Sequence, residues 1–212
     1  MSRTPVTGAD VEQAVALTAA ALREAPENAW KNEAGSMGLD CWDTLDHLNN
    51  GLFSYALRLA PPVPYIEGGV PLLWDRPGPK EQARPIIADR TDGPGALVIL
   101  LEAMGGLVAA MVDARPPTVR AWHIWGVTDP EGFAAMGVVE TLVHAFDLTE
   151  GLGVKFEPPA DLVVPAMARL FPDAPTDTPP WLTLLWATGR GLLEGCEPVG
   201  PDWAWHSAPL AR

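Results

Sequence analysis

A helix is predicted over residues 128–151, TDPEGFAAMGVVETLVHAFDLTEG. The opening TDPE has the spacing of a capping box with a proline in the first turn, and Gly151 is a natural stop. At about 100° per residue, five side chains share one stripe of this helix: Phe133, Met136, Glu140, His144 and Asp147. A carboxylate on a mostly apolar stripe is costly to bury unless it is paired or binds a metal. The spacing of Glu140 and His144 therefore fits either a buried Glu–His hydrogen bond or a shared metal ion.

Three further helical patterns precede this helix in the chain, over about residues 10–24, 40–59 and 95–113. Asp10 is the expected N-cap of the first of them. A crossover rich in Pro and Gly, residues 61–94, separates the second from the third, and a connection of that length often forms part of a site wall. Residues 118–127 could form a short extended segment.

Two weaker helical patterns follow, over about residues 160–170 and 180–193. The predicted fold is therefore all-α. Residues 1–155 would form a four-helix bundle with one long crossover, and residues 156–212 a helical C-terminal extension packed on it.

Composition and charge narrow the function classes. The chain has 212 residues with 27 acidic and 14 basic side chains, a net charge of −13, and no basic run, so nucleic acid and anionic membranes are poor partners. The most apolar run, residues 95–112, is interrupted by Glu102 and is read as a core helix rather than a membrane span. Two cysteines with no C-x-x-C pair predict a reducing, cytoplasmic location.

His47 lies on the second predicted helix, roughly opposite a stripe of leucines. Its face is either solvated or lines a polar cavity whose far wall is the fourth helix. In the second case His47, Glu140 and His144 would supply two imidazoles and one carboxylate and leave open positions, which is the ligand count of a catalytic zinc site. Asp43, one turn before His47, and Asp147 would then orient the two imidazole rings as hydrogen-bond acceptors.

Two short motifs carry a family resemblance. Residues 42–48, WDTLDHL, resemble the metal-ligand helix of the DinB-like bundles, and residues 140–148, ETLVHAFDL, resemble their second ligand helix. The match is closest to the mycothiol-dependent maleylpyruvate isomerase-like branch, which residues 184–190, LLWATGR, also resemble. The middle ligand is Glu140, as in that branch, whereas many DinB-like proteins use three histidines.

The resemblance implies a DinB-like four-helix bundle and a divalent metal, usually zinc, held by His47, Glu140 and His144. It also implies mycothiol, a low-molecular-weight thiol, as cosubstrate. A catalytic arginine is expected in that branch, and Arg84 and Arg90, just before the third helix, are the two candidates.

The chemistry that follows is attack by a metal-bound thiolate on a small electrophilic substrate. Cys41 lies on the leucine stripe and is read as a core residue, so the thiol would be external. A metal-dependent thiol S-transferase or isomerase is therefore the leading hypothesis. The alternatives are a non-catalytic bundle that binds a metal or another ligand, and a purely structural bundle in which Glu140 pairs with His144. Trp42 or Trp122 could form a wall of the pocket, and His123 is read as a packing residue.

Overall fold

The computed structural model describes residues 3–35, 37–71, 85–200 and 202–210. These residues form six α-helices and two short 3-10 helices, η1 (Glu27–Lys31) and η2 (Arg90–Asp92). Extended pairing among them is limited to two isolated bridges, Glu33 with Asp40 and Ala121 with Thr128. The predicted all-α class is confirmed. The extended segment considered for residues 118–127 amounts to the second of these bridges.

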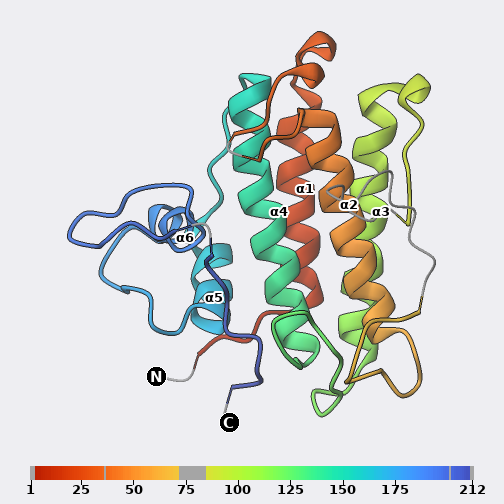
Figure 1. Ribbon diagram of the computed structural model, residues 1–212, viewed down its shortest axis with the longest axis vertical. Helices are drawn as coiled ribbons and strands as arrows, with labels where there is room; N and C mark the ends of the chain where they lie inside the picture. The colour runs from red at the N-terminus through yellow and green to blue at the C-terminus, as the bar shows by residue number, and fades with distance from the viewer. Residues whose placement is uncertain (1–2, 36, 72–84, 201, 211–212) are drawn as a thin grey trace.

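Four long helices form a bundle (Figure 1): α1 (Gly8–Arg23), α2 (Cys41–Leu59), α3 (Gly93–Ala114) and α4 (Pro130–Leu152). α1 and α2 each pack against both α3 and α4. α1 and α4 run in one direction and α2 and α3 in the other, because the crossover after α2 returns the chain to the opposite end of the bundle (Figure 1). α2 therefore faces α4, the helix that carries the predicted polar pair.

α4 is the innermost helix and is buried along almost its whole length. Its cap differs from the predicted capping box. The carboxylate of Asp129 accepts the Gly132 N–H at 2.8 Å, while Glu131 forms an ion pair with the N-terminal arm instead. The helix passes through Gly151 and ends at Leu152, and the C-cap Gly153 has a φ of 70°, in the left-handed region that glycine tolerates best.

α1 and α3 both begin two residues before their predicted starts. Thr7 is the N-cap of α1, and its N–H donates to the carboxylate of Asp10 at 2.7 Å, so Asp10 lies inside the helix rather than at its cap. The segment Arg90–Ala114 is long and apolar enough to span a membrane by length and composition alone, and 44% of its most apolar window is buried in the bundle. A core helix of a water-soluble bundle has the same properties.

The C-terminal extension packs on the bundle through α5 (Ala160–Leu170), which contacts α4, and α6 (Pro180–Ala187), which contacts α5. α6 ends at Ala187 and not near residue 193 as predicted. Gly189 adopts a φ of 70°, and the N–H of Arg190 donates to the carbonyl of Leu185 at 2.7 Å. This tight reversal turns the Arg190 side chain back toward α4.

Arg169 of α5 fastens the last segment of the chain. Its side chain is completely buried and donates to Asp129 Oδ1 at 3.1 Å. It also donates to the carbonyl oxygens of His206 and Ser207 at 3.1 and 3.3 Å. His206 and Ser207, which follow Trp205, are thereby tied to the start of α4.

Candidate metal centre

The structure brings His47, Glu140 and His144 together. Each offers one ligand atom, and these atoms all lie within 4.8 Å of one another. His144 Nε2 is 3.0 Å from Glu140 Oε2, and the His47 ring centroid is 5.1 Å from the His144 ring centroid, with the two rings nearly perpendicular at 86°. This group could hold a metal ion. His47 therefore faces α4, as the cavity interpretation of its helix face requires.

The two helices position these side chains by simple periodicity. Glu140 and His144 are four residues apart on α4 and so occupy neighbouring turns of one stripe. His47 comes from α2, whose opposite side buries Leu45 and Leu48 in the core. Packing of the leucines fixes the rotation of α2 and directs His47 toward the ligand pair on α4.

Asp147 contacts His144 on the side away from Glu140, and Arg190 forms an ion pair with Asp147. Asp147 Oδ2 lies 3.2 Å from His144 Nδ1, so the two nitrogens of His144 face two carboxylates, those of Asp147 and Glu140. Arg190 donates to Asp147 from Nη2 at 2.7 Å and from Nε at 3.0 Å. Because the Asp147 side chain is only 1% exposed and the Arg190 side chain 8%, this pair is shielded from water. A metal ligand whose other ring nitrogen meets a carboxylate is held in one orientation.

The electrostatics favour ionised carboxylates. Burial by itself would raise the pKa of Glu140, but the hydrogen bond and charge of His144, with the charges of His47 and Arg190, lower it to about 2. Burial opposes the charged form of His144, yet hydrogen bonds to Asp147 and Glu140 raise its pKa above the usual value. Burial likewise opposes ionisation of Asp147, and its contacts with His144 and Arg190 lower its pKa. The site is therefore built to attract positive charge.

A cavity of about 540 Å³ opens at these residues. Its lining joins the two ligand helices to the loop before α2, the segment before α4 and the C-terminal extension: Met37, His47, Trp125, Glu140, Val143, His144, Thr188, Gly189, Arg190, Val199 and Trp203. The volume lies in the range of small-molecule binding sites. The extension thus contributes to the same cavity as the bundle.

Of the two predicted arginines, Arg84 lies outside the described residues. Arg90 is about half exposed and donates to Asp43 Oδ1 at 2.6 Å, with its guanidinium over the Trp42 ring. Neither Arg90 nor Asp43 is among the residues that line the cavity. Their predicted roles, catalysis for Arg90 and orientation of His47 for Asp43, stay predictions.

Sequence reasoning missed Arg190 as a site residue because it placed this arginine inside a helix. The signal was present, since Thr188-Gly189 is a helix-terminating pair and a residue after such a stop can point back at the bundle. It also missed Tyr55, two turns after His47 on α2, whose hydroxyl lies 3.4 Å from Glu140 Oε1. The tryptophans that line the cavity are Trp125 and Trp203.

The donor set fits a borderline-soft cation such as zinc, which accepts imidazole nitrogen and carboxylate oxygen. Neighbouring donors around a tetrahedral zinc lie roughly 3.5 Å apart, and the ligand atoms here span 3.0 Å for one pair and at most 4.8 Å for the group. Cys41 offers no alternative ligand, because it is fully buried in the core as predicted, and burial raises the pKa of its thiol to about 11.

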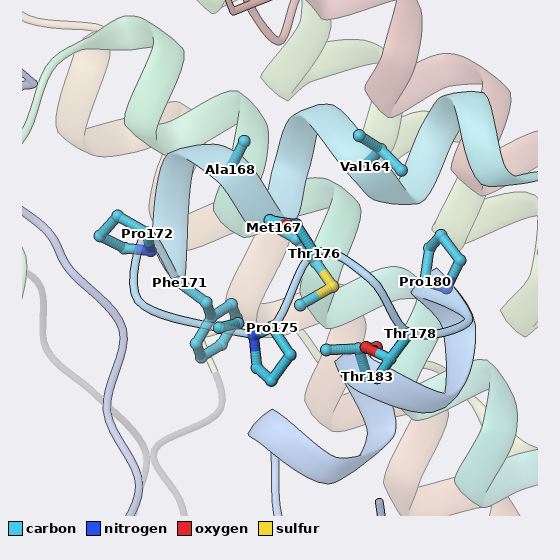
Figure 2. A pocket seen from close by; sticks show the side chains of 11 residues that line it. Val164, Met167, Ala168, Phe171, Pro172, Pro175, Thr176, Thr178, Pro180 and Thr183 are labelled. Carbon is cyan, nitrogen blue, oxygen red and sulfur yellow. The ribbon is translucent and has the colours of Figure 1, made fainter.

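A second cavity, of about 200 Å³, lies in the C-terminal extension between α5 and α6 (Figure 2). Its wall consists of apolar side chains such as Met167 and Phe171 with a few threonines, and no ionisable side chain lines it. Acid–base or metal chemistry therefore has its groups only at the first of these two cavities.

Comparisons with protein-family models, with curated proteins and with solved structures gave no match.

Proposed function

We propose that the protein is a metal-dependent enzyme that uses a low-molecular-weight thiol, mycothiol, as cosubstrate in an S-transferase or isomerase reaction. The observation that carries this proposal is the opening of the His47–Glu140–His144 group onto a cavity of about 540 Å³. Two imidazoles and one carboxylate leave coordination positions free for an exogenous ligand, which distinguishes catalytic from structural zinc sites.

A bound zinc ion would supply the Lewis acidity that keeps a thiol ionised near neutral pH. Residues of the protein would orient the metal ligands. Asp147 fixes the ring of His144 through Nδ1, and Tyr55 can donate its hydroxyl to the Glu140 oxygen that does not face His144. Both contacts reduce the reorganisation needed when the ligands bind a cation.

Among the described residues, Arg190 lines the cavity with a guanidinium that can stabilise an anionic species there. It lines the cavity beside the three ligands, and the bonds from its Nε and Nη2 to Asp147 hold the guanidinium in one orientation. Arg190 is therefore our candidate for the anion-stabilising role, beside the sequence candidates Arg84 and Arg90. A fixed guanidinium can stabilise the negative charge that develops on the substrate during thiol attack.

The nucleophile would come from outside the chain. Cys41 is buried in the core, and Cys196 is not among the residues that line the cavity. In the transferase reaction a carbon–sulfur bond forms and either a leaving group departs with its electron pair or, at a conjugated alkene, the resulting carbanion takes a proton from water. In the isomerase reaction the same addition is followed by rotation and loss of the thiol.

The test is a conjugation assay with mycothiol and 1-chloro-2,4-dinitrobenzene. Zinc-loaded wild-type protein should accelerate product formation, chelator-treated protein should not, and zinc should restore the rate. The variant Arg190→Lys, which keeps the charge but loses the planar fork, should reduce kcat more than it changes zinc content. Equal rates in loaded and chelated wild-type protein would refute a metal-dependent reaction.

A non-catalytic metal- or ligand-binding role is the second candidate. The observation that favours it is that the three candidate ligands could hold an ion in a cavity that neither cysteine lines, so the chain supplies no thiol nucleophile there. This candidate predicts stoichiometric zinc and measurable thiol binding, with no acceleration of conjugation for a panel of electrophiles.

A further inference from the structure

We propose that Trp125 and Trp203 form a recognition wall for a flat aromatic group on the ligand whose reactive end is held at His47, Glu140 and His144. The inference rests on the proposed function and specifies its substrate class: substrates with a flat aromatic or conjugated group rather than small aliphatic ones.

The two indoles line the cavity that contains the three candidate ligands. Trp125 is 42% exposed although several aromatic rings pack beside it. Its ring meets Trp203 edge-on, with centroids 5.5 Å apart and an interplanar angle of 69°. An edge-to-face pair uses one edge and one face, so the ring faces that the pair does not use stay available for a further aromatic group to stack on.

Trp125 and Trp203 both pack against Trp205, which helps to fix their orientation. Trp205 is buried and lies 4.5 Å from Trp125 between ring centroids, again edge-on. The backbone N–H of Trp125 donates to His123 Nδ1 at 3.2 Å, and the buried His123 ring lies 5.6 Å from that of Trp205. Arg169 binds the carbonyl groups that follow Trp205. Two segments far apart in the sequence thus present their indoles in a fixed arrangement, which lowers the entropic cost of binding a flat group.

The cavity has a charged part and an apolar part. The three candidate ligands and Arg190 supply its charged groups, while Met37 and Val143 add apolar surface to that of the two indoles. A ligand that complements both parts has a polar reacting end and a flat apolar end. A small aliphatic substrate would leave the exposed surface of Trp125 in water and gain no apolar contact there.

A pair of thiol probes separates aromatic recognition from simple burial. Benzyl mercaptan and cyclohexylmethanethiol have nearly the same apolar size, but only the first is flat. With Co²⁺-loaded full-length protein, the thiolate-to-cobalt absorption band gives the Kd of each. Wild-type protein should bind the benzyl thiol at least about fivefold more tightly. Trp125→Leu and Trp203→Leu, which keep apolar bulk at the wall, should reduce this preference to below about twofold.

Ile124→Ala is the matched control, since Ile124 is the exposed apolar neighbour of Trp125 and does not line the cavity. It should keep the wild-type preference. Equal affinities for the two thiols in wild-type protein, or a preference that survives both tryptophan substitutions, would overturn the recognition wall while leaving thiol binding at the metal intact.

A second titration is independent of the metal. Benzyl alcohol and cyclohexylmethanol, added to metal-free protein and followed by chemical shifts of the tryptophan indole N–H signals, should differ in Kd by about twofold or more. Loss of the cobalt band with both thiols would count against the proposed function. No preference between the two alcohols would count against the wall itself.

Discussion

Replacing Asp147 by Asn tests how the site is held together. The substitution keeps the size of the side chain and removes its charge, so the core around it is not emptied. Asp147 is 1% exposed and makes its contacts with His144 Nδ1 at 3.2 Å and with Arg190 Nη2 at 2.7 Å. Both partners depend on the carboxylate, one for its orientation and the other for its counter-charge.

The expected effect on zinc binding follows from the role of Asp147 behind His144. Loss of a carboxylate that orients a metal-binding histidine costs about 10- to 100-fold in affinity. That range corresponds to about 1.4 to 2.7 kcal/mol. The free energy of unfolding should also fall, by about 2 kcal/mol. Arg190 can still donate to the amide oxygen of the new side chain, but it loses its bond to an ionised carboxylate. The pair is too deeply buried for salt to screen this loss appreciably.

Zinc affinity is measured by competition with a chromophoric chelator, and stability by urea unfolding of metal-free protein. Asp173→Asn is the control, because Asp173 is exposed and lies outside the cavity, and it should change neither quantity. If Asp147→Asn binds zinc within twofold of wild type, Asp147 does not orient a metal ligand and the reasoning fails.

Three further outcomes are expected. Tyr55→Phe removes the hydroxyl that lies 3.4 Å from Glu140 Oε1, so zinc affinity should fall by about tenfold in the chelator competition; an unchanged value would show that the contact is incidental. Gly151→Ala should lower the free energy of unfolding by about 1 to 3 kcal/mol in urea, since the added Cβ would meet Glu33 O at 2.3 Å and Cys41 Sγ at 2.5 Å. The folded-state pKa of Glu140 is lowered from 4.5 to about 2, so its contribution to the stability of metal-free protein is present above pH 4.5 and is lost as pH falls toward 2. Over that interval wild type should lose on the order of 3 kcal/mol more unfolding free energy than Glu140→Gln, and parallel pH profiles would contradict the ionised, paired state of Glu140.

Local sequence patterns predicted the features that depend on one helix at a time. The four-residue spacing of Glu140 and His144 placed them on one stripe, and the leucine stripe of α2 predicted which side of that helix is buried. Cys41 is in the core for the same reason. Helix ends were predicted less well, because competing caps lie close together: Asp129 rather than Thr128 caps α4.

Features that depend on tertiary contacts could not be predicted from the sequence alone. The sequence allows His47 to face either solvent or a cavity, and only the packing of α2 against α4 places it beside His144. Arg190 reaches the site because a left-handed Gly189 reverses the chain, and its partner Asp147 is more than forty residues earlier. Trp125 and Trp203 share a cavity only because the C-terminal segment folds back on the start of α4. The spacing of apolar residues within one helix carries no information about contacts between distant segments.

The central claim is that His47, Glu140 and His144 bind one metal ion, and elemental analysis of zinc-equilibrated protein tests it most directly. Wild type should hold one zinc per chain, and so should His206→Ala, which removes an exposed histidine outside the cavity. His47→Ala and His144→Ala should each retain far less after the same desalting. One tightly bound zinc in His47→Ala protein would contradict a site shared between α2 and α4.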